Sequence, residues 1–179
     1  IHTEMLSEGI VDLYEAGAID GTRKSILPEK IVASFAMGTR RLYDFMDDNP
    51  AVFLLGSDFV NDPFTIAQND NVVAVNGAIQ IDLTGQVNSD SMGAQPYSGI
   101  GGQVDFIRGA SRSKGGHPII ALPSTAKRGT ISRIVEVLKL PHADLDTGGG
   151  VVLAEIKGRV GVYARLASNF EPDAGGADC

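Results

Sequence analysis

The chain has 179 residues, of which 43% are hydrophobic and 21% charged, a composition typical of a globular domain with a sizeable core. Its formal net charge of −7, from 22 acidic and 15 basic side chains, argues against a nucleic-acid partner, which requires a positive surface. The single cysteine, Cys179, excludes an internal disulfide and a cysteine metal cluster, and a reducing, cytoplasmic setting without a bound metal is expected. No apolar run approaches the ~20 residues of a membrane span, so no membrane partner is expected.

The first third of the chain alternates between amphipathic and short apolar segments. Apolar residues recur at helical spacing over residues 4–16, and Gly17 is a suitable C-terminal stop for this helix. Residues 31–35 and 51–55 are apolar runs of strand length, and the segment between them, residues 39–47, has a helical pattern. This order predicts helices alternating with buried strands.

Beyond residue 60 the sequence predicts short helices and a series of strands. Asp62-Pro63 opens a turn before a short helix that runs through Ile66. Strands are predicted over residues 72–75, 78–83, 86–88, 118–122, 131–138 and 151–156. Short apolar strands mixed with helices and glycine-rich connections favour an α/β fold, with an open, mostly parallel sheet and flanking helices.

The end of the chain differs in composition from the rest. Residues 1–145 are expected to form one domain, and residues 146–179 an atypical tail. Residues 169–179 have no apolar period and end in small and acidic side chains, which predicts a frayed or disordered end.

A glycine-rich loop is the strongest local feature. Gly99, Gly101 and Gly102 stand within four positions, directly before a short helical pattern with Val104 and Phe106 as apolar positions. Glycine lets the backbone approach a ligand without a Cβ in the way, and the unpaired N–H groups of a helix start can hold an anion or an oxyanion. The spacing alone is equally compatible with an ordinary turn.

Six segments in order carry a resemblance to a known family. They are residues 1–5 (IHTEM), 30–35 (KIVASF), 75–82 (VNGAIQID), 99–106 (GIGGQVDF), 123–127 (PSTAK) and 132–135 (SRIV). Together they resemble the acetyl-CoA hydrolase/transferase family, which includes 4-hydroxybutyrate and butyrate:acetate CoA-transferases. The resemblance is nearly continuous from residue 1 to about residue 138. It implies the C-terminal CoA-transferase domain, with a fold like that of NagB and RpiA, a missing N-terminal domain, and a homo-oligomer in the complete protein.

The resemblance implies covalent catalysis by Glu4. In such enzymes the carboxylate attacks an acyl-CoA, the released CoA thiolate converts the anhydride into a glutamyl-CoA thioester, and a second carboxylate reverses these steps. The expected partners are therefore acyl-CoA and a small carboxylate, with coenzyme A as substrate. Its position alone favours a different reading of Glu4, as a helix-start acid facing the positive end of the helix dipole; only the surrounding motif favours the nucleophile.

Further site residues follow from the same resemblance. Gly102 corresponds to the glycine whose N–H binds the oxyanion, and Gly101 is the neighbouring candidate. Asn61 corresponds to an active-site asparagine that could hold the reacting glutamate, although Asn61-Asp-Pro also makes an ordinary turn. Contacts to coenzyme A or to the acyl group are expected from Ser98, Gly101, Gly102, Gln103 and Lys127. Simpler roles remain open for three of them: a turn hydroxyl at Ser98, a helix cap at Gln103 and a solvated surface cation at Lys127.

The sequence departs from the family after about residue 145. Relatives carry a Val-Thr-Glu-Tyr-Gly segment there, whereas this chain reads VVLAEI over residues 151–156, and Glu155 does not stand at the matching spacing. A frameshift or a chimeric join is one hypothesis for this difference. Because the family's N-terminal half contributes to the cleft, the piece alone is expected to have little or no turnover. An acyl-CoA hydrolase and a non-catalytic α/β domain that binds a nucleotide or a partner are the alternative functions.

Overall fold

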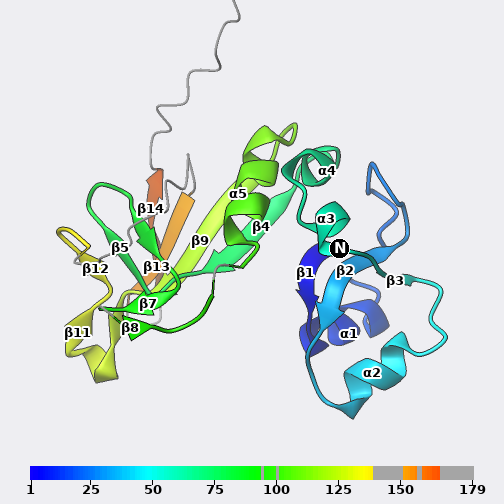
Figure 1. Cartoon of the computed structure of the whole chain (residues 1–179), viewed down its shortest axis with the longest axis horizontal. Helices are drawn as coiled ribbons and strands as arrows, with labels where there is room; N and C mark the ends of the chain where they lie inside the picture. The colour runs from blue at the N-terminus through cyan, green and yellow to red at the C-terminus, as the bar shows by residue number, and fades with distance from the viewer. Residues whose placement is uncertain (94, 100, 139–150, 157–158, 166–179) are drawn as a thin grey trace, which may run out of the picture.

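The computed structural model describes residues 1–93, 95–99, 101–138, 151–156 and 159–165. One side of the molecule is a three-stranded parallel sheet in the order β1-β2-β3, with two helices packed on it (Figure 1). Its elements are β1 (His2–Leu6), α1 (Glu8–Glu15), β2 (Ile31–Ala36), α2 (Arg40–Met46) and β3 (Val52–Leu54). Its core consists of Leu6, Val11, Ile31, Ala33 and Leu42.

The other side is a four-stranded sheet in the order β14-β13-β9-β4. Its strands are β4 (Val73–Gly77), β9 (His117–Pro123), β13 (Val151–Ile156) and β14 (Arg159–Arg165). The first three are parallel and β14 is antiparallel to β13. Helix α5 (Gln103–Arg112) contacts β4 and β9, and its buried Ile107 joins a core cluster with Ile120 and Leu122 of β9.

Short strands form the connections around this second sheet. A mixed three-stranded sheet in the order β12-β5-β6 packs beside β9, and two small hairpins flank it. The elements are β5 (Gln80–Asp82), β6 (Val87–Asn88), β7 (Ser91–Met92), β8 (Gln95–Pro96), β10 (Thr125–Ala126), the 3-10 helix η1 (Lys127–Gly129), β11 (Ile131–Ser132) and β12 (Ile134–Val135).

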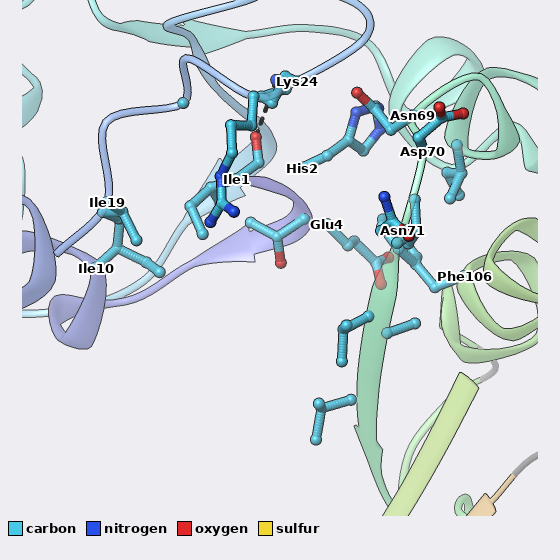
Figure 2. A pocket seen from close by; sticks show the side chains of 18 of the residues that line it. Ile1, His2, Glu4, Ile10, Ile19, Lys24, Asn69, Asp70, Asn71 and Phe106 are labelled. Atoms are coloured by element: carbon cyan, nitrogen blue, oxygen red, sulfur yellow. Dashed lines mark hydrogen bonds between the residues drawn. The ribbon is translucent and has the colours of Figure 1, made fainter. Parts of the chain in front are cut away.

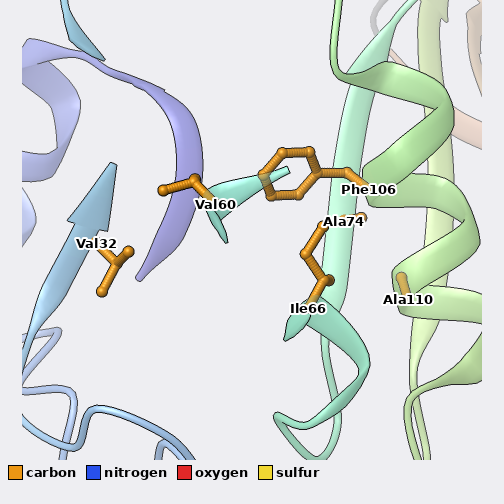
Figure 3. Close-up of a cluster of buried hydrophobic side chains, with 6 residues drawn as sticks. All are labelled: Val32, Val60, Ile66, Ala74, Phe106 and Ala110. Atoms are coloured by element: carbon orange, nitrogen blue, oxygen red, sulfur yellow. The ribbon is translucent and has the colours of Figure 1, made fainter. Parts of the chain in front are cut away.

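Two short helices, α3 (Ser57–Val60) and α4 (Pro63–Ala67), connect the two sides. Asp62 caps α4 by accepting hydrogen bonds from the Phe64 and Thr65 backbone N–H groups, and Pro63 occupies the first turn, as helix starts favour. A core cluster links both sheets through these helices (Figure 3). It consists of Val32 from β2, Val60, Ile66, Ala74 from β4, and Phe106 and Ala110 from α5.

The predicted α/β class with mostly parallel strands is confirmed, and so are most of the predicted strands and helices. The helix predicted over residues 4–16 is wrong at its start, because residues 2–6 pair in register with β2 and the helix begins only at Glu8. The alternative reading of Glu4 as a helix-start acid is therefore wrong as well. None of the described helices is long and apolar enough to cross a membrane.

The strand predicted over residues 131–138 is divided into two. Residues 131–132 pair with β10, whereas residues 134–135 pair with β5, so the chain changes partner at Arg133. Apolar, β-branched composition favours a strand here, but it does not determine which strand it pairs with. The strand predicted over residues 151–156 is confirmed as β13, and the disorder predicted over residues 169–179 lies outside the described residues.

Two helical glycines predict opposite responses to the same substitution. A Cβ on Gly109 in α5 would lie 2.5 Å from Cγ2 of Ile66, whereas nothing lies within 4 Å of a Cβ on Gly9 in α1. We expect Gly109→Ala to lower the free energy of unfolding by about 1–3 kcal/mol, because a tight helix–helix contact must open. Gly9→Ala is the matched control and should raise it by about 0.5–1 kcal/mol. Urea unfolding measures both changes, and effects of the same sign would contradict this packing.

Candidate functional site

The two sides of the molecule meet at a hydrogen bond between Glu4 and Gly102. Glu4 is the middle residue of β1, and Gly102 is the residue directly before α5. The Gly102 N–H donates to Oε2 of the Glu4 carboxylate at 2.9 Å, across 98 positions of the chain. The fold therefore brings together the carboxylate and the glycine amide that the sequence pattern singles out.

The alternation of β1 explains why Glu4 points toward α5. Side chains of a strand alternate between its two faces, so His2, Glu4 and Leu6 share one face. Leu6 is fully buried in the core with α1 and α2, and the His2 ring packs against Phe59 and Phe106. Glu4 is held between these two anchored side chains, half-buried.

Residue 102 must be glycine because two side chains approach its backbone closely. Its φ of −79° is accessible to every residue, so backbone strain does not require glycine at this position. A Cβ there would lie 2.5 Å from Nδ2 of Asn61 and 2.6 Å from Oε2 of Glu4. These two side chains therefore converge on the same small space in front of the Gly102 amide.

Asn61 is placed by the turn between α3 and α4. Asn61 is the C-terminal cap of α3, its backbone N–H donates to the carbonyl of Ser57 at the start of that helix, and the next residue, Asp62, caps α4. The Oδ1 atom of Asn61 accepts a long hydrogen bond, 3.5 Å, from the hydroxyl of Ser34 in β2. The sequence analysis did not identify Ser34, since nothing in its strand pattern distinguishes this hydroxyl from any other.

His2 is packed between β1 and the neighbouring helices. Its Nε2 lies 2.8 Å from the Val60 carbonyl oxygen, and its Nδ1 is buried with no hydrogen-bond partner among the described residues. Burial lowers the pKa of His2, and the nearby charge of Lys24 acts in the same direction. The hydrogen bond to the Val60 carbonyl opposes this lowering, and the net effect favours the neutral form of the ring.

A second carboxylate, Asp105, stands in the first turn of α5. Burial raises the pKa of the Asp105 carboxyl, the positive charge of Arg108 opposes this rise, and the negative charge of Glu4 adds to it. The sequence analysis did not single out Asp105, although its position three residues after Gly102 places it in the first turn of the predicted helix.

The other loop residues surround the Glu4–Gly102 contact unequally. A Cβ on Gly101 would lie 3.8 Å from Oε2 of Glu4, whereas a Cβ on Gly99 would meet nothing within 4 Å. Gln103 begins α5, and its Nε2 is buried with no hydrogen-bond partner among the described residues. Ser98 is exposed, and its hydroxyl donates to the Gly99 carbonyl at 3.1 Å.

Lys127 lies apart from this group. It stands in η1, between the hairpin strands β10 and β11, where its side chain is exposed. Figure 1 shows this hairpin on the far side of the larger sheet from β1. The described chain therefore brings Glu4, Gly101, Gly102, Gln103 and Asn61 together and leaves Lys127 outside the group.

A large pocket opens next to Glu4, with a volume of about 1040 Å³. Figure 2 shows Ile10 and Ile19 on one side of it, and the side chains of His2 and Glu4 extending toward Asn69, Asn71 and Phe106 on the other. Among the residues that the structure describes, no group of three or more His, Cys, Asp or Glu side chains is arranged to hold a metal ion.

Comparisons with known proteins agree on one family. The acetyl-CoA hydrolase/transferase C-terminal domain matches residues 38–149. The chain is 51% identical over 151 residues to the 4-hydroxybutyrate coenzyme A transferase of Clostridium kluyveri, covering 84% of this chain and 34% of that protein. It is 30% identical over 115 residues to an acetyl-CoA hydrolase of Candida albicans, covering 63% of this chain and 21% of that protein.

Solved structures show the same similarity. The crystal structure of RipA from Yersinia pestis has a TM-score of 0.80 and 47% identity, covering 86% of this chain and 35% of that chain. A 4-hydroxybutyrate CoA-transferase from Porphyromonas gingivalis has a TM-score of 0.75 and 41% identity, covering 93% of this chain and 37% of that chain. The chain thus spans about a third of the length of the Clostridium kluyveri, Yersinia pestis and Porphyromonas gingivalis proteins.

The close approach at Gly102 predicts a specific displacement. Gly102→Ala should move the Glu4 carboxylate by the difference between 2.6 Å and an ordinary contact near 3.4 Å, because the new Cβ occupies its space. Gly101→Ala is the matched control, since its Cβ lies at an ordinary 3.8 Å from the same oxygen. Crystal structures of both variants make the comparison. A Glu4 carboxylate that keeps its place in Gly102→Ala contradicts this geometry.

Proposed function

Because the chain belongs to the acetyl-CoA hydrolase/transferase family, we propose that it forms the C-terminal part of an acyl-CoA:carboxylate CoA-transferase. The observation that carries this proposal is the Glu4 carboxylate held 2.9 Å from the Gly102 N–H. The names of relatives support it, since they include 4-hydroxybutyrate, succinyl-CoA and butyryl-CoA transferases. Residues 1–145 make up this domain in the proposal, and the complete protein supplies the N-terminal domain.

Glu4 is the nucleophile in the proposed reaction. Its carboxylate attacks the acyl-CoA carbonyl, forms a mixed anhydride and releases the CoA thiolate. The thiolate then attacks the Glu4 carbonyl carbon, which gives the glutamyl-CoA thioester and releases the first carboxylic acid as its anion. A second carboxylate attacks this thioester and reverses the sequence, leaving as the new acyl-CoA. Each intermediate remains an activated acyl compound, so the energy of the thioester is retained.

The Gly102 amide suits the step in which the thiolate attacks Glu4. That attack places negative charge on the oxygen bonded to the Glu4 carbonyl carbon. The Gly102 N–H already lies 2.9 Å from Oε2, within the range of about 2.7–3.1 Å that oxyanion stabilisation requires. The donor therefore needs no reorganisation to stabilise this tetrahedral intermediate, in which Oε2 carries the charge.

The remaining predicted residues have supporting roles in the proposal. Asn61 keeps the Glu4 carboxylate in place, because its Nδ2 faces the same space as Oε2 of Glu4. Gln103, the first residue of α5, contacts the acyl group through its side-chain amide. Ser98, Gly101 and Lys127 contact coenzyme A, and Lys127 reaches the distal part of that ligand from outside the group around Glu4.

The first competing function is an acyl-CoA hydrolase, which uses the same residues. Distant relatives named acetyl-CoA hydrolase favour it. The two activities differ only in whether water is excluded when the acyl or glutamyl group is transferred. A non-catalytic domain that binds a nucleotide or a partner through the Gly99–Gln103 loop is the competing function of another class.

Covalent modification of Glu4 separates catalysis from mere binding. After incubation of the complete protein with acyl-CoA and borohydride, mass spectrometry should find a reduced Glu4 side chain or its CoA adduct. Glu4→Gln should lose the modification and at least ~10³-fold of the transfer rate, because the attacking group is gone. Glu15→Gln changes an exposed acid of α1 and is the matched control. An active Glu4→Gln variant would contradict the role of Glu4 as nucleophile, and an unmodified Glu4 in the unaltered protein would favour the binding function.

Dependence on acetate separates the transferase from the hydrolase. We expect conversion of the starting acyl-CoA to require an added carboxylate such as acetate and to yield acetyl-CoA without net loss of thioester, because water must be kept from the anhydride and the thioester. Chromatographic separation of the CoA compounds, with and without acetate in the complete protein, measures this dependence. Formation of free CoA at the same rate under both conditions identifies a hydrolase and contradicts the transferase.

A further inference from the structure

Glu4 and Ser34 are neighbours on adjacent strands. In the parallel register of β1 and β2, Met5 pairs with Phe35. One position earlier on each strand, Glu4 therefore lies beside Ser34. Residues that lie side by side in a sheet point to the same face. The Ser34 hydroxyl is thus on the face of the sheet that carries the Glu4 carboxylate, and both side chains are half-buried.

The end of α3 is held against both of these strands. Val32 of β2 is fully buried in the core cluster that also contains Val60 (Figure 3). On β1, the Nε2 atom of His2 lies 2.8 Å from the Val60 carbonyl oxygen. Val60 directly precedes Asn61, so the backbone is fixed to the sheet at the residue before Asn61.

The side chain of Asn61 extends from Ser34 to the space beside Glu4. Its Oδ1 atom accepts the 3.5 Å hydrogen bond from the Ser34 hydroxyl. On the other arm of the amide, its Nδ2 atom converges with Oε2 of Glu4 on one point in front of the Gly102 backbone. A hydroxyl in β2 therefore holds one end of the amide whose other end faces the carboxylate.

The bond from Ser34 restrains the rotation of the Asn61 amide. Among the described residues, Ser34 is the hydrogen-bond partner of this side chain. The last torsion of an asparagine has a broad energy profile, so an amide without a partner turns easily. Turning would move Nδ2 away from Glu4, or bring Oδ1, which repels a carboxylate, toward it. The Ser34 hydroxyl opposes this rotation because it donates to Oδ1.

This restraint matters most when Glu4 carries no charge. As a carboxylate, Glu4 attracts the N–H groups of an amide more strongly than a neutral carbonyl does. In the anhydride and the thioester of the proposed reaction, the Glu4 carbonyl is neutral and the attraction is weaker. The Ser34 hydroxyl holds the far end of the amide in both states. Nδ2 therefore stays in place for the next tetrahedral intermediate.

We propose that Ser34 is a positioning residue of the transfer reaction, which acts through Asn61 and touches neither substrate. This inference rests on the proposed function, in which Asn61 keeps the Glu4 carboxylate in place. Ser34 does not line the pocket beside Glu4. Loss of its hydroxyl should therefore slow the reaction of bound substrates and leave their binding unchanged.

Two variants of Ser34 in the complete protein test this role. Ser34→Ala removes the hydroxyl and should lower kcat by about 3–10-fold, the effect of one hydrogen bond, with KM unchanged. Ser34→Thr is the matched control, because it keeps the hydroxyl and a β-branched residue suits a strand. Its kcat should stay close to that of the unaltered protein. An unchanged kcat in Ser34→Ala, or an equal fall in both variants, overturns the proposal.

A double-mutant cycle tests whether Ser34 acts through Asn61. Asn61→Ala removes the amide, so adding Ser34→Ala to it should lower kcat by no more than about 2-fold further. The same decrease in both backgrounds would give Ser34 a role of its own and overturn the proposal.

Glu4→Gln separates the role of Ser34 from the proposed function. If Glu4→Gln abolishes transfer and Ser34→Ala does not slow it, only the role of Ser34 is wrong. If Glu4→Gln remains active, the proposed reaction is wrong, and the role of Ser34 is wrong with it.

Crystal structures of the complete protein and of its Ser34→Ala variant give a readout besides activity. The Asn61 amide should have one conformation in the unaltered protein, with Nδ2 toward Glu4, and should leave it in the variant. An amide that keeps its place in both structures overturns the proposal.

Discussion

The hydrogen bond from the Gly102 N–H to the Glu4 carboxylate is the contact on which the site depends. It joins β1 to the start of α5, and therefore one sheet to the other. It is possible only because residue 102 lacks a Cβ and because the core cluster of Val32, Ala74 and Phe106 fixes the two sides against each other. The residues of the candidate site thus lie where the two sheets meet.

Local sequence pattern predicts the elements whose structure is determined locally. The apolar runs of β2 and β9 and the glycine loop before α5 are readable because composition and spacing alone favour these structures. The glycine loop also predicts that a functional group approaches the backbone closely, and this approach is why residue 102 must be glycine. The family resemblance adds the identity of Glu4 as a nucleophile, which no periodicity indicates.

Features that depend on contacts between residues far apart in the sequence could not be predicted from the local pattern. Residues 2–6 form a strand because they pair with residues some 30 positions away, although their own spacing continues the helical period of α1. Ser34 contacts Asn61 only because β2 packs against α3. The charge of Glu4 raises the pKa of Asp105 only because the fold brings β1 next to α5. The split of residues 131–138 between two partners likewise depends on which strands lie nearby.

The pocket beside Glu4 connects the fold to the proposed activity. Residues of both β1 and β4 line it, so it lies where the two sheets meet, as the Glu4–Gly102 contact does. In the proposed reaction the 179-residue chain supplies the glutamate and its amide donor, and the N-terminal domain of the complete protein supplies the rest of the cleft. The 179-residue chain is therefore expected to have little turnover by itself.

The transfer rate of Gly102→Ala in the complete protein tests the central claim most directly, namely that Glu4 and Gly102 form one reaction centre. If they do, the added Cβ displaces the nucleophile from its donor, and kcat should fall by about 10²–10³-fold, as on loss of an oxyanion donor. Gly101→Ala, whose Cβ keeps an ordinary distance of 3.8 Å from the Glu4 carboxylate, should change kcat far less. Equal kcat values for the two variants would contradict the account.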